Sequence, residues 1–299
     1  MKRSVVGVVL GLLLLPGVSH AWWGGGHDLI TIAAVRATPG DIPAFFREGA
    51  RGVAHMVYDP DIVKNRGVPL ARGAEHSEHY LDLELLEGRP LPRTRYAFIE
   101  LCYELGVKPE HVGTVAYAVS EWTERLTVVF AEHRKWPDNP YIQSKCLMYA
   151  GILAHYAEDT CQPLHLTVHF NGKKQDDGTV LHKGIHEKVD ALPETLRMDP
   201  DELANGLHVA PVDSLMPEVI AQLYRGFKLV DSVYALGDRL PKYGQTDWNV
   251  DREVVAFANE RARESVRFTA SLFVTAWRNS SSIELPGWLD RSKDTQTQE

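Results

Sequence analysis

Apolar side chains recur every three or four residues over long stretches of this sequence, and alternation typical of a half-buried β-strand is scarce. The clearest helical stretch begins at Pro109, a suitable first residue of a helix, and runs to Lys135. Residues 27–36 form a short apolar segment, and we expect further helices over residues 141–159, roughly 217–236, and roughly 251–278. The sequence therefore predicts an all-α fold, with a polar loop at Gly172–Gly178. No repeat or linker divides the chain, so we expect one multi-helix domain over residues 22–290 and a polar, disordered tail over 291–299.

The first 21 residues have the features of a secretory signal peptide. Two basic residues precede an apolar run from Val5 to Leu15, and the small residues Ser19 and Ala21 stand where signal peptidase requires them. A run this short is not a membrane span, which takes roughly 20 apolar residues, although an uncleaved short anchor is the alternative. We expect cleavage after Ala21, a secreted or periplasmic protein without a transmembrane segment, and a mature chain that begins at Trp22.

The chain is acidic, with a formal net charge of −8 that becomes about −10 once the two basic residues of the signal peptide are removed. A basic surface for tight binding of duplex DNA is therefore absent. A metal-dependent phosphodiesterase is not excluded, because bound cations would supply positive charge where the phosphate binds.

Three cysteines, Cys102, Cys146 and Cys161, occur in the chain. In an exported protein the simplest arrangement is one disulfide and one free thiol, and the sequence does not indicate which pair forms. The spacing Cys-x-x-Cys does not occur, so the sequence does not suggest a thiolate zinc site.

Histidine and aspartate recur at helical spacing in two places. His155 and Asp159 are four residues apart, so on a helix they lie on one face within reach of a common ion, and His165 follows the Gln-Pro turn that ends this helix. His186 and Asp190 repeat the spacing early in a helix that starts near residue 184. Imidazole nitrogen and carboxylate oxygen are zinc ligands, and two such pairs with a histidine between them favour a metal site over two solvated helix faces.

Four other ionisable residues lie near these pairs in the sequence. Glu158 and Glu187 adjoin the pairs but point to other faces of their helices, so we do not include them. His169 and His182 lie four residues from a proposed ligand. They are either alternative ligands or residues that line the site and hydrogen-bond to the ligands.

The pattern resembles the trinuclear-zinc family that contains the single-strand-specific nucleases of fungi and plants and the bacterial zinc-dependent phospholipases C. That family has a helical His-x-x-x-Asp, then Gln-Pro-Leu-His, then a second His-x-x-x-Asp or Glu, all of which occur here between His155 and Asp190. It also has a mature N-terminal tryptophan whose free amine binds metal, with a histidine five residues later in the nucleases. Trp22 and His27 have this spacing, and the signal-peptide pattern independently makes Trp22 the first residue.

Two further segments complete the resemblance. Residues 79–82, His-Tyr-Leu-Asp, look like the family's His-aromatic-x-Asp, with His76 as a competing ligand that no aromatic residue follows. Asp61 and Lys64 look like its upstream Asp-x-x-Arg, and Asp59 is the alternative to Asp61. Lysine in place of arginine is a departure, because an ammonium is a point charge and not a planar fork. The spacing from Asp61 to the histidine is also a few residues longer than in the family.

The resemblance implies three zinc ions. Their ligands would be Asp61, His79, His155 and Asp159 for one ion; His165, His186 and Asp190 for a second; and the Trp22 amine and carbonyl, His27 and a shared Asp159 for the third. It also implies catalytic roles for three residues. Asp159 would bridge the two ions that hold the attacking water, Asp61 would orient that water or accept its proton, and Lys64 would contact the transition state.

The resulting prediction is a secreted zinc-dependent hydrolase of phosphodiesters. The leading substrate is single-stranded RNA or DNA, with removal of 3′-phosphates as a further activity. Tyr80 would stack on a nucleobase while Asp82 reads the base edge, unless Tyr80 simply packs beside the metal ligand. The alternative is a phospholipase C that acts on lipid headgroups, and a lesser alternative is a non-catalytic secreted protein that binds zinc. The sequence indicates no stable protein partner.

Overall fold

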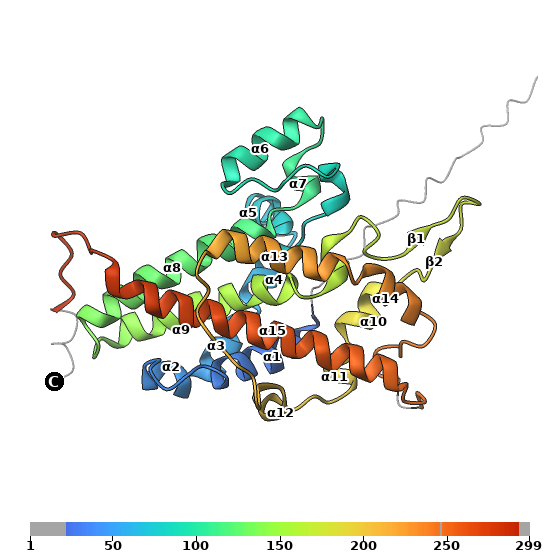
Figure 1. Ribbon diagram of the computed structural model, residues 1–299. Helices are drawn as coiled ribbons and strands as arrows, with labels where there is room; N and C mark the ends of the chain where they lie inside the picture. Colours follow the sequence, from blue (N-terminus) through green and yellow to red (C-terminus); the bar gives the residue numbers. More distant parts are fainter. Residues whose placement is uncertain (1–21, 246, 293–299) are drawn as a thin grey trace, which may run out of the picture.

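Three long helices form the frame of the structure, a computed structural model that describes residues 22–245 and 247–292. These helices are α8 (Val115–Lys135), α9 (Pro140–Asp159) and α15 (Arg252–Asn279), and each packs against the other two. In Figure 1 they run side by side across the molecule. The predicted all-α fold is confirmed. The predicted signal peptide and residues 293–299 of the predicted tail lie outside the described residues.

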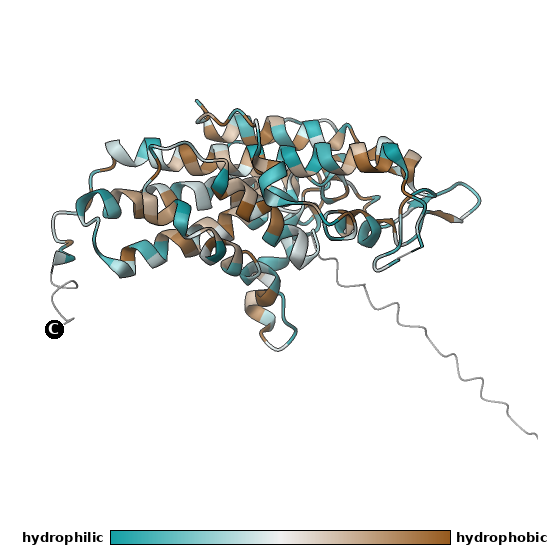
Figure 2. Cartoon of the chain, turned by 90° about the horizontal axis from the view of Figure 1, so that it is seen from below, coloured by the Kyte–Doolittle hydropathy of each residue, from teal (hydrophilic) through white to brown (hydrophobic). Residues whose placement is uncertain are grey.

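Capping residues explain where two of the long helices begin. The Asn139 side chain accepts hydrogen bonds from the backbone N–H groups of Tyr141 and Ile142, and Pro140 follows it at the first helical position. Asp251 caps α15 in the same way, by accepting from Glu253 and Val254. Figure 2 shows hydrophobic and hydrophilic residues interleaved along these helices, as expected where one side of a helix faces a core.

Shorter elements surround this frame. On the N-terminal side they are α1 (Gly24–Arg36), α2 (Ala44–Glu48), α3 (Ala50–Met56), α4 (Asp59–Val63), α5 (Pro69–Glu75), α6 (Arg95–Glu104) and α7 (Pro109–Val112). After α9 follow α10 (Ile185–Asp190), α11 (Leu192–Thr195), α12 (Pro200–Ala204), α13 (Leu215–Phe227) and α14 (Val230–Leu236). Single 3₁₀ turns are η1 (His76–His79), η2 (Leu83–Leu86), η3 (Pro163–Leu166) and η4 (Ser280–Ser282).

Helices α1 and α3 both pack against α9, the helix that carries the first His-x-x-x-Asp pair. Gly151 of α9 permits the close approach of α3, because a Cβ atom at this position would lie 2.5 Å from the Val53 carbonyl oxygen. The loop after α3 and the first turns of α1 are thereby held beside the C-terminal half of α9. None of the helices in the described residues is long and apolar enough to cross a membrane.

The structure corrects several boundaries predicted from the sequence. The helix expected from Pro109 to Lys135 is two helices, because Gly113 between α7 and α8 has φ 95°, which ends helical geometry. The helix expected over 217–236 is α13 followed by α14, with Lys228 and Leu229 between them. The predicted polar loop at 172–178 contains the strand β1 (Lys173–Lys174), which pairs antiparallel with β2 (Val180–Leu181) just after the loop.

The predicted disulfide is wrong, because all three cysteines are free and buried. Cys102 lies on α6, Cys146 lies near the start of α9, and Cys161 follows the end of α9. The Cys161 thiol has its own partners, since the Gln222 amide donates to its sulfur at 3.1 Å. Each cysteine is therefore a small apolar residue of the core.

Gly113 yields a prediction for stability. Its backbone (φ 95°, ψ 158°) lies in a region that is essentially restricted to glycine, and a Cβ atom there would lie 2.1 Å from the Tyr80 carbonyl oxygen. That carbonyl accepts the Val115 N–H at 3.2 Å, so both segments are fixed. Gly113→Ala should lower the free energy of unfolding by about 3 kcal/mol or more, as measured by urea denaturation. Gly88→Ala is the control, because Gly88 also has positive φ but no atom near its Cβ position. Equal losses in the two variants would contradict the steric explanation.

Candidate metal centre

Five ionisable side chains from four elements meet at the C-terminal half of α9. His155 and Asp159, one turn apart on α9, are both completely buried. Around them lie His27 from α1, Asp61 from α4 and His79 from the end of η1. The i, i+4 spacing therefore places His155 and Asp159 on one face of α9, as helix geometry predicts. Elements remote in the sequence supply the other three side chains.

Asp61, His79 and His155 form the first triad of potential ligands. The Asp61 Oδ1 atom is 3.8 Å from His79 Nδ1 and 3.7 Å from His155 Nε2. Asp159 Oδ2 is 3.2 Å from His79 Nδ1 and 3.6 Å from His155 Nε2. Ligand atoms about 2.1 Å from one tetrahedral zinc ion lie roughly 3.4 Å apart, so these separations suit a single ion.

His27, His155 and Asp159 form the second triad. The Nε2 atom of His27 is 3.4 Å from Asp159 Oδ1, and the rings of His27 and His155 stack with centroids 4.3 Å apart. The two oxygens of Asp159 thus face different sides, Oδ1 toward His27 and Oδ2 toward His79 and His155. This arrangement allows the one carboxylate to serve two ions.

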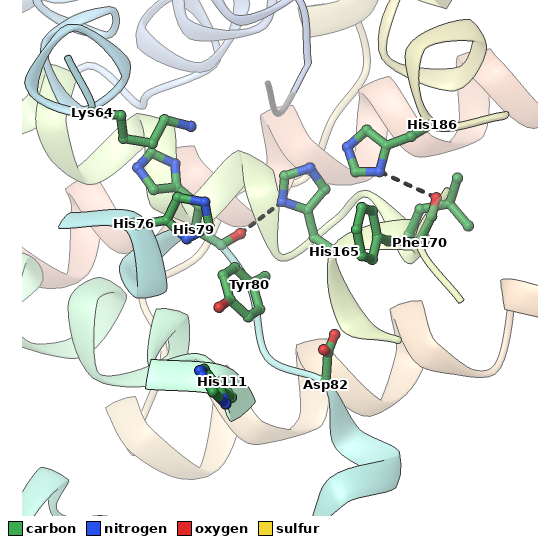
Figure 3. A pocket seen from close by; sticks show the side chains of 10 residues that line it. Lys64, His76, His79, Tyr80, Asp82, His111, His165, Phe170 and His186 are labelled. Atoms are coloured by element: carbon green, nitrogen blue, oxygen red, sulfur yellow. Dashed lines mark hydrogen bonds between the residues drawn. The ribbon is translucent and has the colours of Figure 1, made fainter. Parts of the chain in front are cut away.

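His165, His186 and Asp190 form the third triad. His186 Nε2 is 3.0 Å from Asp190 Oδ2, and the rings of His165 and His186 are 4.9 Å apart. Hydrogen bonds orient the triad from behind: His165 Nδ1–H donates to the His79 carbonyl at 2.7 Å, and the Gln162 amide donates to Asp190 Oδ1 at 2.6 Å. Figure 3 shows the first of these bonds as a dashed line. Such contacts to the far side of metal ligands are typical of metal sites.

We call the eight residues of these triads the ligand cluster: His27, Asp61, His79, His155, Asp159, His165, His186 and Asp190. Its buried atoms without a hydrogen bond in the described part of the chain include His27 Nε2, Asp159 Oδ1 and His165 Nε2. Buried polar atoms in native proteins almost always have partners. Each triad could hold a metal ion, and an ion would provide the partner that these atoms lack.

Burial also sets the protonation states of the ligand cluster. It is the main reason that the pKa values of His27, His79 and His165 lie well below the ordinary value, and it lowers the pKa of His155 to about 3. Neutral imidazole is the form that binds metal, so these histidines are ready to bind at neutral pH. Burial, followed by the nearby Asp61 carboxylate, raises the pKa of Asp159. A bound cation would lower the pKa of Asp159 again, because its charge offsets both the burial of this carboxylate and the repulsion from Asp61.

A cavity of about 340 Å³ opens beside the ligand cluster (Figure 3). Ten residues line it: Lys64, His76, His79, Tyr80, Asp82, His111, Leu164, His165, Phe170 and His186. A substrate in this cavity would therefore contact ligands of the first and third triads.

Of the predicted catalytic residues Lys64 lines this cavity, whereas Asp61 and Asp159 are not among the lining residues given above, and both predicted substrate-binding residues, Tyr80 and Asp82, line it. The Lys64 ammonium is 2.5 Å from Asp61 Oδ1 and is buried. The Tyr80 hydroxyl donates to the Glu110 carbonyl at 2.7 Å, which fixes the ring at the cavity wall. Burial and the neighbouring Glu84 raise the pKa of Asp82 to about 7. Tyr80 and Asp82 follow the ligand His79 in sequence, so η1 and its exit place all three together.

The structure distinguishes between the alternatives left by the sequence. Asp61 lies in a triad and Asp59 does not, among the residues that the structure describes. His79 lies in a triad, whereas His76 lines the cavity wall. His182 faces Asp238, with 3.5 Å between Nδ1 and Oδ1, and does not line the cavity.

His169 and Trp22 complete the list of predicted residues. The His169 carbonyl accepts the Tyr234 hydroxyl, and its imidazole belongs to no triad among the described residues. Trp22 lies beside α9, where its indole Nε1–H donates to the Glu158 carbonyl at 3.2 Å. The role of the Trp22 amine as a ligand stays a prediction, because it depends on cleavage next to residues that the structure does not describe.

Glu158 is the residue that the sequence interpretation missed. It lies where α9 packs against α1, and the His27 ring of α1 contacts both Glu158 and Asp159. Its carboxylate is completely buried there and lies 2.6 Å from His27 Nδ1. The signal that was available is an acidic residue beside Asp159 in an otherwise apolar stretch of α9, since an acid that is buried needs a partner.

Comparison with known proteins identified no match that bears on this site. No known protein family matches the chain, and no curated protein is significantly similar to it. The ligand cluster and the cavity beside it are therefore the basis for any functional conclusion.

Proposed function

We propose that this protein is a secreted zinc-dependent phosphodiesterase that cleaves single-stranded RNA or DNA. The observation that carries the proposal is that two of the three triads share a residue. His155 belongs to two of them, and Asp159 directs one oxygen toward each of those two sides. A structural zinc site normally needs four ligands that enclose one ion, whereas this ligand cluster extends to the wall of a cavity.

Zinc at these positions would lower the pKa of a water molecule and offset the negative charge of the phosphate. The residues of the chain have complementary roles. Asp61 belongs to the first triad and lies beside Lys64, where it would orient the attacking water or take its proton. Lys64 lines the cavity directly beside Asp61 and would bind a phosphoryl oxygen as a positive point charge.

The substrate class follows from Tyr80 and Asp82. A phenol ring held at the cavity wall offers a face on which any nucleobase can stack, which is how proteins bind single strands with little sequence preference. The Asp82 carboxyl, with its pKa raised to about 7, can accept a hydrogen bond from a base edge or donate one. The neighbouring Phe170 offers a second aromatic surface.

A phospholipase C is the second candidate, because apolar side chains are exposed on the segments that follow Asp61 and at the cavity wall. Ile62, next to the ligand Asp61, is 64% exposed, and Leu70 of the following helix is 91% exposed. Phe170 at the cavity wall is also exposed. Apolar side chains beside a phosphodiester site suit a substrate that is embedded in a lipid surface.

An assay on parallel substrates tests the proposal. Protein with Trp22 as its first residue is incubated with single-stranded RNA, single-stranded DNA and phosphatidylcholine vesicles, with and without a chelator. We expect chelator-sensitive cleavage of the nucleic acids. Release of phosphocholine without cleavage of nucleic acid would replace the nuclease with a phospholipase C, and stoichiometric zinc without hydrolysis of any substrate would favour a non-catalytic zinc protein.

Tyr80→Ala sharpens this test. Loss of a stacked base is worth about 1–3 kcal/mol, so kcat/KM for single-stranded substrates should fall roughly 5- to 150-fold. Tyr96→Ala is the control, because Tyr96 is 81% exposed on α6 and does not line the cavity. If Tyr80 only packs beside His79 and does not stack on a base, Tyr80→Ala should lower kcat/KM equally for a dinucleotide and for a phosphodiester without bases. That result would contradict the stacking role.

A further inference from the structure

Glu158 is a buried carboxylate that lies outside the ligand cluster and has a partner for each oxygen. Its Oε2 atom is 2.6 Å from His27 Nδ1, and its Oε1 atom accepts the Thr31 hydroxyl at 2.8 Å. Its backbone carbonyl accepts the indole N–H of Trp22 at 3.2 Å. One residue therefore contacts both the first described residue of the chain and a histidine of the second triad.

The contact with His27 fixes the orientation of the imidazole. An ionised Glu158 carboxylate can only accept a hydrogen bond, so beside it the hydrogen atom of a neutral His27 ring would lie on Nδ1. The lone pair is then on Nε2, which is the atom that faces Asp159 Oδ1 at 3.4 Å. The stacked ring of His155 restricts the His27 plane from the side.

Thr31 holds the carboxylate in turn. It lies one helical turn after His27 on α1, so both side chains project from the same face toward α9. Its hydroxyl is completely buried and occupies the second oxygen of Glu158. With a donor on each oxygen, the carboxylate cannot rotate away from His27 without leaving a buried donor unpaired.

We propose that Glu158 is the positioning residue of a distinct cation site formed by His27, His155 and Asp159. The inference deepens the proposed function and rests on its metal-binding part. Carboxylates that accept the second N–H of a ligating histidine set its tautomer and raise its basicity. Because Glu158 also binds the Trp22 indole, it holds the N-terminal residue and the histidine of this site together.

Zinc titration of the processed protein tests the inference. Glu158→Met retains the volume but removes both acceptors, and the affinity for one zinc ion should fall about 100-fold while the other sites keep theirs. Glu158→Gln retains one acceptor oxygen, so it should restore much of the affinity and leave a loss of about tenfold. Thr31→Val removes the donor to the second oxygen, so the Glu158 carboxylate can rotate. The zinc affinity of this variant should fall about as much as that of Glu158→Gln.

Glu132→Gln is the matched control. Glu132 is also a buried glutamate, but it pairs with Lys145 at 2.5 Å and takes no part in the ligand cluster. This variant should lose stability without losing zinc. Equal loss of zinc in this variant and in Glu158→Met would mean that zinc content merely follows stability, which would overturn the inference.

Nitrogen NMR of the histidine rings provides a readout that general destabilisation does not move. In the zinc-free protein a neutral His27 ring should carry its hydrogen on Nδ1, and Glu158→Met should give a mixture of tautomers for this ring alone. If Glu158→Met does not fold, Glu158→Gln and Thr31→Val decide. A parent protein that binds no zinc would overturn the proposed function as well. Zinc binding by the parent, with unchanged affinity and His27 signals in the folded variants, would overturn the role of Glu158 alone.

Discussion

Asp159→Ala should remove two of three bound zinc ions and lower kcat for phosphodiester cleavage by about 10⁴-fold or more. The reason is the placement of its oxygens, with Oδ1 3.4 Å from His27 Nε2 and Oδ2 3.2 Å from His79 Nδ1. Loss of this one carboxylate takes a ligand from the second triad and a carboxylate oxygen from beside His79 and His155 of the first. Zinc content by elemental analysis and single-turnover cleavage of a short oligonucleotide measure the two effects.

Asp190→Ala is the matched control for this prediction. Asp190 is equally buried and also follows a histidine by four residues, but it belongs only to the third triad. It should therefore cost one zinc ion. Unchanged zinc content in Asp159→Ala, or the same loss in both variants, would show that Asp159 is not shared.

The part of the site that could be predicted from the sequence is the part that local geometry determines. His155 and Asp159 must share a face because helix geometry relates residues four apart, and the same holds for His186 and Asp190. The all-α fold follows from periodicity for the same reason. Asp61 and His79, in contrast, were assigned from a resemblance, and the structure brings both to His155.

The part that could not be predicted depends on packing between remote elements. The sequence interpretation excludes Glu158 because it points to another helix face than Asp159, and only the docking of α1 on α9 shows that the His27 ring contacts both carboxylates. The break at Gly113 was missed because the apolar period continues across it. The close contact with the Tyr80 carbonyl that requires glycine there comes from a segment more than thirty residues earlier.

The cysteines show a third limit. Their number suggested one disulfide, but pairing depends on distance in the fold, and the core holds each thiol separately. The number of cysteines can suggest an oxidising compartment, but it does not determine whether two of them lie close enough in the fold to form a disulfide.

Removal of zinc should have the largest effect on stability. A ligand present at about 1,000 times its dissociation constant stabilises the folded state by about 4 kcal/mol per site, so three sites contribute roughly 12 kcal/mol. Domains are stable by only about 5–15 kcal/mol in total. A chelator should therefore lower the melting temperature by tens of degrees or unfold the protein, and added zinc should restore it, as followed by circular dichroism.

The pH dependence of this stability has a definite sign. Burial keeps the folded histidines neutral, with the pKa of His155 lowered to about 3, whereas unfolded histidines take up protons near pH 6.5. Below about pH 6.5 the unfolded chain binds more protons than the zinc-loaded folded state, so stability must fall as the pH falls. The melting temperature of the zinc-loaded protein should therefore be nearly constant from pH 8 to about 6.5 and then decrease. A melting temperature that a chelator leaves unchanged at every pH would show that the buried imidazoles and carboxylates of the ligand cluster are stable without cations, which would remove the basis for a metal-dependent reaction.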